Sequence, residues 1–253
     1  MKSEKKNNTL EDLISIVKKL RSPDGCDWDK QQTHESLIPY FLEESHEVVE
    51  AIQSKNYDSL KEELGDLFLH IIFQIDLAEE KKKFFLKDVL QGINNKLINR
   101  HSHIFYDKDD SKYKEGNWEE SKQKEKNRDS ILDGVPISLP ALLRSRRIQE
   151  KAANVGFDWE KMDQVLSKVD EEIDELKESI IENKGINEEL GDVLFTIVNL
   201  SRHLDINPEQ ALNESTNKFI KRFKRIEKDL KDKKIDIKEL SLEELDVLWE
   251  KNK

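Results

Sequence analysis

Apolar residues recur every three or four positions along most of this chain, which is the spacing of one face of an α-helix. No clear run alternates apolar and polar residues in the way that a half-buried strand would. The 8 glycines and 5 prolines leave few places at which helices could be interrupted. The pattern therefore predicts an all-α protein built from long helices.

The apolar spacing also gives approximate helix positions. Helices are expected near residues 9–21, 34–53, 58–81, 84–100, 117–128, 140–153, 160–182, 186–204, 208–231 and 241–251, and a polar loop near 106–117. Asn207-Pro208 marks a helix start especially well, because Asn caps the first turn and Pro fits the first helical position.

The chain contains the same motifs twice. The matching strings are CDWDK at 26–30 and FDWEK at 157–161, EESHE at 43–47 and EEIDE at 171–175, EELGD at 62–66 and 188–192, NKLINR at 95–100 and NKFIKR at 217–222, and, more loosely, WEESK at 118–122 and WEKNK at 249–253. Their order is the same in both halves. We interpret this as a tandem duplication of one helical unit, residues 1–133 and 134–253, with a joint near GVPISLP.

Carboxylates interrupt the apolar stripes of these helices. Glu44 takes a core position three residues after Phe41 and four before Val48, and Glu172 takes the equivalent position in the second repeat. In both EELGD helices the second Glu and the Asp border the stripe. The carboxylates expected to cluster are Glu44, Glu47, Glu63 and Asp66 in the first repeat, and Glu172, Glu175, Glu189 and Asp192 in the second.

A short loop joins the two carboxylate-bearing helices of each repeat, so these helices should pack antiparallel and bring the four side chains together. Protonation could relieve their repulsion, but a divalent cation does so better, and all-oxygen ligation favours Mg²⁺ or Mn²⁺. The remaining motif glutamates are expected to be ordinary solvated residues: Glu43, Glu62, Glu171 and Glu188. Gly65 and Gly191 are either points where a ligand or neighbouring helix approaches closely, or simple packing sites.

The composition excludes several functions. A net charge of −11 argues against general nucleic-acid binding, although a bound cation could still bridge acidic groups to a phosphate. The single cysteine, Cys26, allows no internal disulfide and suits the cytoplasm. The N-terminal residues lack the apolar core of a signal peptide, and no apolar run is long enough to span a membrane.

The motif E-E-x-x-E followed by E-x-x-D resembles the signature of the MazG family of nucleoside triphosphate pyrophosphohydrolases. Both copies match it, and CDWDKQQTHESL, RHSHIF and VGFDW resemble the family's flanking strings, with Asp27 standing where Pro is expected. The resemblance implies the all-α pyrophosphatase fold, a homodimer, and Mg²⁺-dependent attack of water on the α-phosphorus of NTPs. The products would be NMP and pyrophosphate, and one of the carboxylates could act as the general base.

The resemblance also implies a substrate-binding set. Lys168, Lys218 and Arg222 would contact phosphates, and Trp249 would pack against the nucleotide. From the residues alone, the basic helix could equally be a solvated face, and Trp249 could be a C-terminal core anchor. Tyr40 stands in the first repeat where the second has Lys168, and a lysine meets a triphosphate better than a phenol does. We therefore expect the second repeat to do most of the hydrolysis.

Two other classes of function are considered. A ferritin-like di-metal oxidase would use Glu43-x-x-His46, but the second repeat has Asp174 at the histidine position. A non-catalytic helical regulator or scaffold that only binds a nucleotide would share the sequence pattern. Release of pyrophosphate in the presence of a divalent metal distinguishes the enzyme from the regulator.

Overall fold

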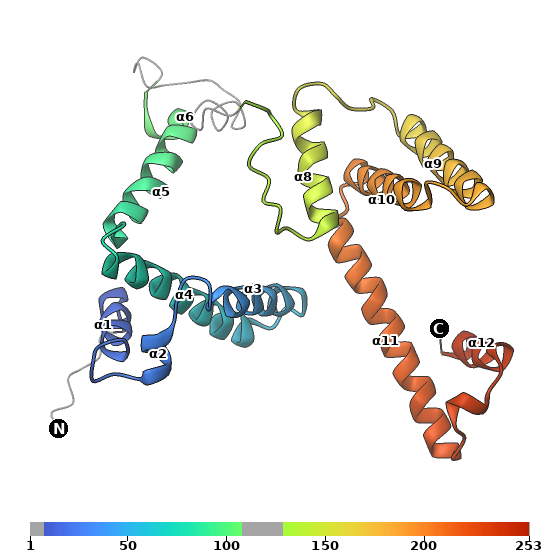
Figure 1. The fold of residues 1–253 in the computed structure, drawn as a ribbon, viewed down its shortest axis with the longest axis horizontal. Coiled ribbons are helices and arrows are strands. Elements are labelled where there is room, and N and C mark those ends of the chain that lie inside the picture. Colours follow the sequence, from blue (N-terminus) through green and yellow to red (C-terminus); the bar gives the residue numbers. More distant parts are fainter. Residues whose placement is uncertain (1–7, 108–128, 253) are drawn as a thin grey trace. The chain divides into compact units, whose positions relative to one another are not determined.

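The computed structural model describes residues 8–107 and 129–252, which form helices joined by short connections (Figure 1). Within these two ranges there is no β-strand, which confirms the expected all-α class. Contacts between Cα atoms divide the chain into two compact units, Met1–Glu115 and Gly116–Lys253. The division falls in the segment that is not described, so the repeat boundary at residues 133 and 134 stays a prediction.

The described part of the first unit contains the four helices that the sequence predicts between residues 9 and 100, together with two short ones. They are α1 (Leu10–Leu20), α2 (Asp27–Gln31), α3 (Ile38–Gln53), α4 (Tyr57–Glu80), α5 (Leu86–Arg100) and α6 (Ser102–Phe105). The short helices α2 and α6 were not expected from the apolar spacing. The helix predicted at 117–128 and most of the loop predicted at 106–117 lie outside the described residues.

The second unit repeats the same plan of helices. They are α8 (Ala141–Ala153), α9 (Met162–Glu182), α10 (Ile186–His203), α11 (Pro208–Lys233), the 3₁₀ turn η1 (Ile237–Glu239) and α12 (Leu242–Lys251). The start of α11 is confirmed, because the Asn207 side chain accepts hydrogen bonds from the backbone N–H groups of Glu209 and Gln210. Asn56 caps α4 in the same way.

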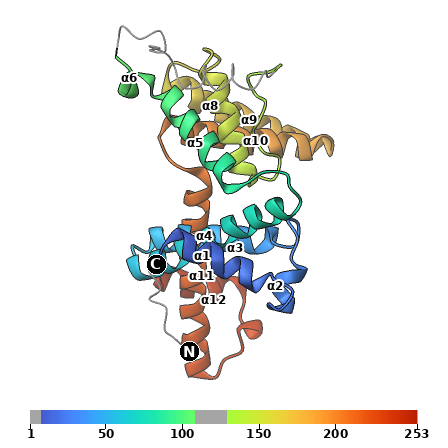
Figure 2. The same ribbon diagram turned by 90° about the vertical axis from the view of Figure 1, so that its left-hand side faces the viewer.

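The core of the first unit lies where α1 packs on α4, as two views agree (Figures 1 and 2). Its buried side chains are Val17, Leu37, Ile72, Phe73 and Leu77. Beside it, Arg21 is buried and its Nε donates to Asp76 Oδ2 at 2.7 Å. Because removing either partner of a buried ion pair leaves an uncompensated charge, this pair fixes α1 against α4.

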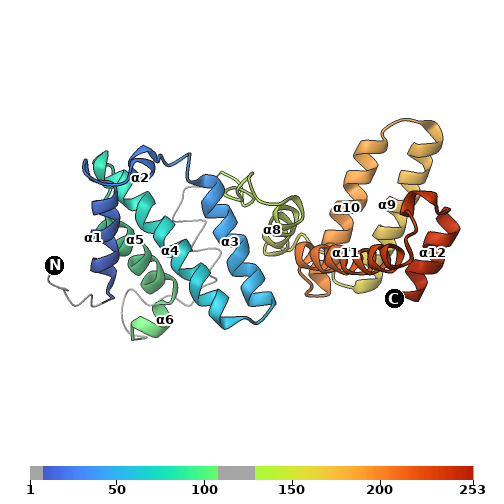
Figure 3. The same ribbon diagram turned by 90° about the horizontal axis from the view of Figure 1, so that it is seen from below.

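Each repeat contains one antiparallel helical hairpin, α3–α4 and α9–α10, in which the two helices lie side by side (Figure 3). The tight α9–α10 connection places Asn183 and Gly185 in the left-handed backbone region, with φ of 53° and 75°. The hairpins are the elements that hold the predicted carboxylates. Helix α11 leads away from the α9–α10 hairpin and carries α12 alongside it (Figure 1).

Candidate metal and substrate site

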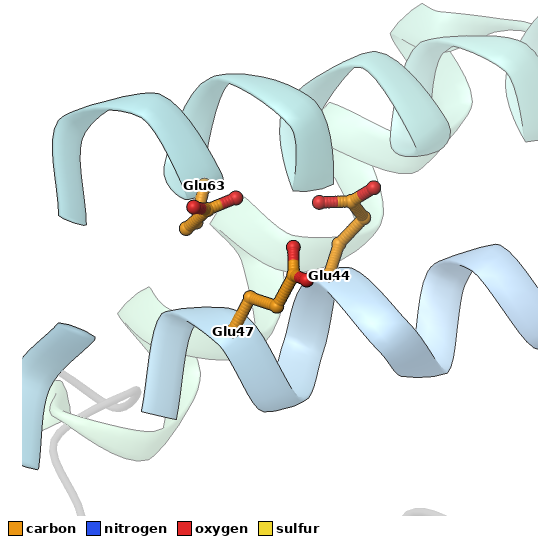
Figure 4. A group of neighbouring side chains, drawn as sticks. All are labelled: Glu44, Glu47 and Glu63. Atoms are coloured by element: carbon orange, nitrogen blue, oxygen red, sulfur yellow. The ribbon is translucent and has the colours of Figure 1, made fainter. Parts of the chain in front are cut away.

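The first hairpin brings three of its four predicted carboxylates together. Glu44 and Glu47 extend from α3 toward Glu63 on α4 (Figure 4). One carboxylate oxygen from each of these residues lies within 4.8 Å of the others. Asp66 is not part of this closest group, but its negative charge acts on Glu44. The hairpin therefore provides an all-oxygen set of the kind that holds Mg²⁺ or Mn²⁺.

The second hairpin builds an equivalent group from a different set of three. Glu172 on α9 and Glu189 and Asp192 on α10 have carboxylate oxygens within 4.8 Å of one another. Glu172 is buried, with 6% of its surface exposed, which is unusual for a carboxylate. Glu175 lies outside the closest three, yet its charge acts on Glu189. Both quartets are thus electrostatically coupled, although each gathers only three members closely.

Burial and the closeness of these carboxylates to one another raise the pKa of three of them. Burial raises the pKa of Glu44, and the charges of Asp66 and Glu47 raise it further. Burial and then the charge of Glu47 raise the pKa of Glu63 in the same way. In the second hairpin, burial followed by the charge of Glu175 raises the pKa of Glu189. Clustered carboxylates with raised pKa values are stabilised by a cation, which fits a divalent metal in both hairpins.

Lys168 distinguishes the two hairpins. Its Nζ lies 2.8 Å from Glu172 Oε1 and 2.9 Å from Glu171 Oε1. Hydrogen bonds to Glu172 and Glu171 hold the pKa of Lys168 above its usual range, so this side chain stays a cation at neutral pH. The second repeat therefore carries a fixed positive charge at its carboxylate group. The first repeat has Tyr40 there, which places an aromatic ring beside its carboxylates.

Glu171 was expected to be an ordinary solvated residue, and it is exposed, as are Glu43, Glu62 and Glu188. Its contact with Lys168 was not anticipated. An i, i+3 spacing allows such a contact on a helix, and this spacing is the signal that could have identified it.

A further contact that the sequence did not reveal supports the second hairpin. Arg202 at the end of α10 makes a two-pronged contact with Asp158, in which its NH1 group donates to Oδ2 at 2.8 Å. His203 Nε2 lies 3.1 Å from the same carboxylate. Asp158 belongs to the repeated FDWEK string, so this string fixes the segment before α9 to the end of α10 and thereby supports the hairpin.

Among the described residues, the motif glycines do not serve packing between helices. A Cβ added to Gly65 or Gly191 would meet nothing within 4 Å among the described residues. The expectation that a neighbouring helix of the same chain approaches closely, or that the glycines are packing sites within it, is therefore wrong. A glycine inside a helix still costs about 1 kcal/mol relative to alanine. Close approach by a ligand stays a prediction.

The other predicted substrate residues form a separate group on α11 and α12. Trp249 lies with its ring centroid 4.9 Å from that of Phe219, and the Arg222 guanidinium lies 5.5 Å from the Trp249 centroid. Lys218 is exposed on the same helix as Arg222. Among the described residues, no hydrogen bond or ion pair joins these three side chains to the α9–α10 carboxylates. Lys168 is the one member of the predicted set that contacts a predicted metal ligand.

Comparison with known proteins agrees with this arrangement. The sequence model of the MazG nucleotide pyrophosphohydrolase domain matches twice, at residues 32–105 and 160–226, and each match contains one carboxylate hairpin. The chain belongs to the MazG family. Its family membership confirms the resemblance seen in the repeated motifs, and with it the class of nucleotide pyrophosphohydrolases.

Curated relatives match this MazG-family chain over nearly its full length. It is 47% identical to the nucleoside triphosphate pyrophosphohydrolase/pyrophosphatase MazG of Thermotoga maritima, over 96% of this chain and 95% of that protein. It is 39% identical to the nucleoside triphosphate pyrophosphohydrolase of Escherichia coli K12, over 97% of each chain. An uncharacterized Bacillus subtilis protein, YabN, is 41% identical over 94% of this chain and half of its own length. The tandem arrangement is thus present in full-length relatives.

One negative observation accompanies these matches. In the described part of the chain, no helix has the length and hydrophobicity that crossing a membrane requires.

Proposed function

We propose that this chain hydrolyses nucleoside triphosphates to nucleoside monophosphates and pyrophosphate, by attack of water on the α-phosphorus. The observation that carries the proposal is the carboxylate group built twice on antiparallel MazG hairpins, each with oxygens within 4.8 Å of one another. The full-length relatives named as nucleoside triphosphate pyrophosphohydrolases support the same reaction. Control of the nucleotide pool is the role we assign to it, and a cytoplasmic location remains a prediction.

The residues present fit a divalent cation. Glu172, Glu189 and Asp192 would hold Mg²⁺ or Mn²⁺ in the second repeat, with Glu175 completing the quartet. Glu44, Glu47, Glu63 and Asp66 would do the same in the first. When bound, the cation would acidify a water molecule and neutralise charge on the triphosphate. A carboxylate that is not fully engaged as a ligand would accept the proton of the attacking water.

Cationic side chains complete the proposed site. The ammonium group of Lys168 lies 2.8 Å from Glu172. It can exchange its contact with this carboxylate for a contact with an arriving phosphate. Lys218 and Arg222 would hold the remaining phosphates. Trp249 would pack against the nucleotide, using the ring that Phe219 and Arg222 already support. These groups orient the triphosphate for in-line attack, which is most of what an enzyme contributes to phosphoryl transfer.

The proposal is tested by identifying which phosphorus the water attacks. Incubation with a panel of NTPs and dNTPs in ¹⁸O-labelled water and Mg²⁺ is expected to give labelled monophosphate and unlabelled pyrophosphate. Chromatography with mass spectrometry measures both products. Nucleoside diphosphate with labelled orthophosphate would show attack at the γ-phosphorus and contradict the proposal. A nucleotide that binds without any product would identify the chain as a regulator or scaffold instead.

We also propose a homodimer. Large apolar side chains are exposed along two helices, and apolar surface of this kind marks protein–protein contacts. On α5 these exposed residues are Val89, Leu90, Ile93 and Leu97, and on α10 they are Leu190, Leu194, Phe195 and Ile197. A second copy would cover such stripes, as the resemblance to the MazG family implies.

The dimer is tested by mass. Light scattering at micromolar concentration is expected to give about twice the 29.8 kDa of one chain. Leu97→Glu places a charge within the exposed stripe of α5 and is expected to shift the mass toward the monomer. Lys61→Glu, at an exposed site on α4, serves as a charge-changing control. A wild-type mass near that of the monomer across the concentration range would contradict the proposal.

A further inference from the structure

The first repeat places three aromatic rings beside its carboxylates, two of them at positions where the second repeat has Lys168 and Thr196. Tyr40 lies one turn before Glu44 on α3, and His70 lies one turn after Asp66 on α4. The two rings are stacked, with centroids 6.3 Å apart and planes only 8° from parallel. Trp28 lies edge-on to Tyr40 at 5.8 Å. The three rings therefore form one group at a single end of the carboxylate cluster.

Trp28 is matched by Trp159 in the second repeat, but the positions equivalent to Tyr40 and His70 have a different character. Lys168 replaces Tyr40, as the offset between EESHE and EEIDE shows, and Thr196 replaces His70, as the EELGD offset shows. Lys168 is held by carboxylates rather than by a ring. At these two positions the first repeat therefore has aromatic side chains where the second has a lysine and a threonine, although both repeats keep the carboxylates.

The aromatic group is open to a ligand. Trp28 is 50% exposed and Tyr40 is 40% exposed, which leaves large apolar ring surface in water. His70 is nine-tenths buried, and its Nδ1 has no hydrogen-bond partner among the described residues. An unpartnered buried polar atom is unfavourable, and a hydrogen-bonding ligand that enters beside Tyr40 could provide the partner.

We propose that Trp28 and Tyr40 form a nucleobase-binding subsite, so that the first repeat binds a nucleoside triphosphate by its base as well as by its phosphates. This inference rests on the proposed metal site of the same repeat. Four residues of helix separate Tyr40 from Glu44 by about 6 Å along the axis, which leaves room for a ribose between a stacked base and metal-bound phosphates. Aromatic side chains bind any base through its π face, and purines offer the larger surface.

The subsite is tested by comparing a nucleotide with its phosphates alone. Full-length protein carrying Glu172→Gln and Glu189→Gln, which weakens the second site, is titrated calorimetrically in Mg²⁺. The ligands are α,β-methylene-ATP, whose α–β linkage resists hydrolysis, and inorganic tripolyphosphate. Adding Tyr40→Leu is expected to weaken binding of the nucleotide about 5- to 150-fold, the range for loss of one base–aromatic stack, and to leave tripolyphosphate unchanged.

Three controls make the test specific. Tyr40→Phe keeps the ring and should retain nucleotide affinity. Tyr57→Leu removes a tyrosine that is 80% exposed at the other end of α4 and should have no effect. Adding Glu44→Gln with Glu63→Gln should abolish binding of both ligands to the first repeat.

Each contrary result overturns the subsite in a recognisable way. Equal nucleotide affinity with and without the Tyr40 ring would exclude stacking. A parallel loss of tripolyphosphate binding would show a structural role for Tyr40. If the Tyr40→Leu variant keeps its nucleotide affinity but its mass in solution falls toward that of the monomer, the rings belong to a subunit interface. If tripolyphosphate does not bind the first repeat in Mg²⁺, the proposed metal site of that repeat fails, and the subsite fails with it.

Discussion

Replacing Glu172 and Glu189 by glutamine is expected to lower pyrophosphate release from NTPs by about 10²–10³-fold or more, the loss typical when a preorganised charge partner is removed. Glutamine keeps the size and hydrogen-bonding capacity of the side chain but removes the negative charge that would hold the cation. Glu172 is buried and contacts Lys168, so this change also removes one of the two negative charges that pair with the lysine.

The matched variant in the first repeat is Glu44→Gln with Glu63→Gln. It removes two carboxylates from an equally close group, in the repeat that has Tyr40 at the position of Lys168. Most of the activity is expected to remain. Rates are measured by coupled detection of pyrophosphate under saturating NTP and Mg²⁺, and circular dichroism verifies that both variants are folded. Equal losses in two folded variants would show that both repeats catalyse, and the asymmetry assigned to Lys168 would be wrong.

Removing divalent cations is expected to abolish activity, and Mg²⁺ or Mn²⁺ should restore it. Without a cation the triphosphate would have to approach clustered carboxylates, and like charges at such distances repel strongly. The measurement is pyrophosphate release after EDTA treatment and dialysis, followed by titration with each metal. Zn²⁺ is expected to restore less, because an all-oxygen set suits the harder cations. Full activity in EDTA would refute the metal-dependent mechanism.

The raised pKa values of Glu44, Glu63 and Glu189 set the pH dependence of this metal requirement. The cation needs deprotonated ligands, so the Mg²⁺ concentration for half-maximal rate should rise as pH falls through these raised values, above the ordinary carboxyl value of 4.5. For the metal-free protein the sign is opposite. The folded chain holds protons that the unfolded chain releases, so these groups' contribution to stability is lost as pH rises through the same range.

A glutamine variant separates the contribution of Glu44 to the stability of the metal-free protein from that of the other carboxylates. In EDTA at neutral pH, Glu44→Gln removes one of the repelling charges and is expected to raise Tm slightly above that of the wild type. The difference should shrink as pH falls and Glu44 itself becomes protonated. Differential scanning fluorimetry across this pH range measures the Tm of the wild type and of the variant. A Tm difference that does not depend on pH would show that repulsion among the carboxylates does not determine the stability of the hairpin.

The sequence by itself located the helices of both hairpins and the carboxylates that they carry. Apolar spacing of three and four residues located α3, α4, α9 and α10, because a helix that buries one face needs a continuous stripe. Glu44 and Glu172 were visible because each breaks such a stripe with a charge. The duplication then gave an internal control, since the same interruption occurs twice in the same order. Local spacing carries all of this information.

Only the tertiary structure decided which members of each predicted quartet lie closest together. Periodicity places residues on a face of one helix, but the register between two helices depends on how their side chains interlock, and spacing within one helix does not contain it. Thus the three closest carboxylates differ between the repeats, with Asp66 outside one group and Glu175 outside the other. Contacts between distant segments, such as Asp158 with Arg202, were equally invisible. The stacking of Tyr40 on His70 belongs to the same class, because it joins two helices whose register is fixed only when the hairpin packs.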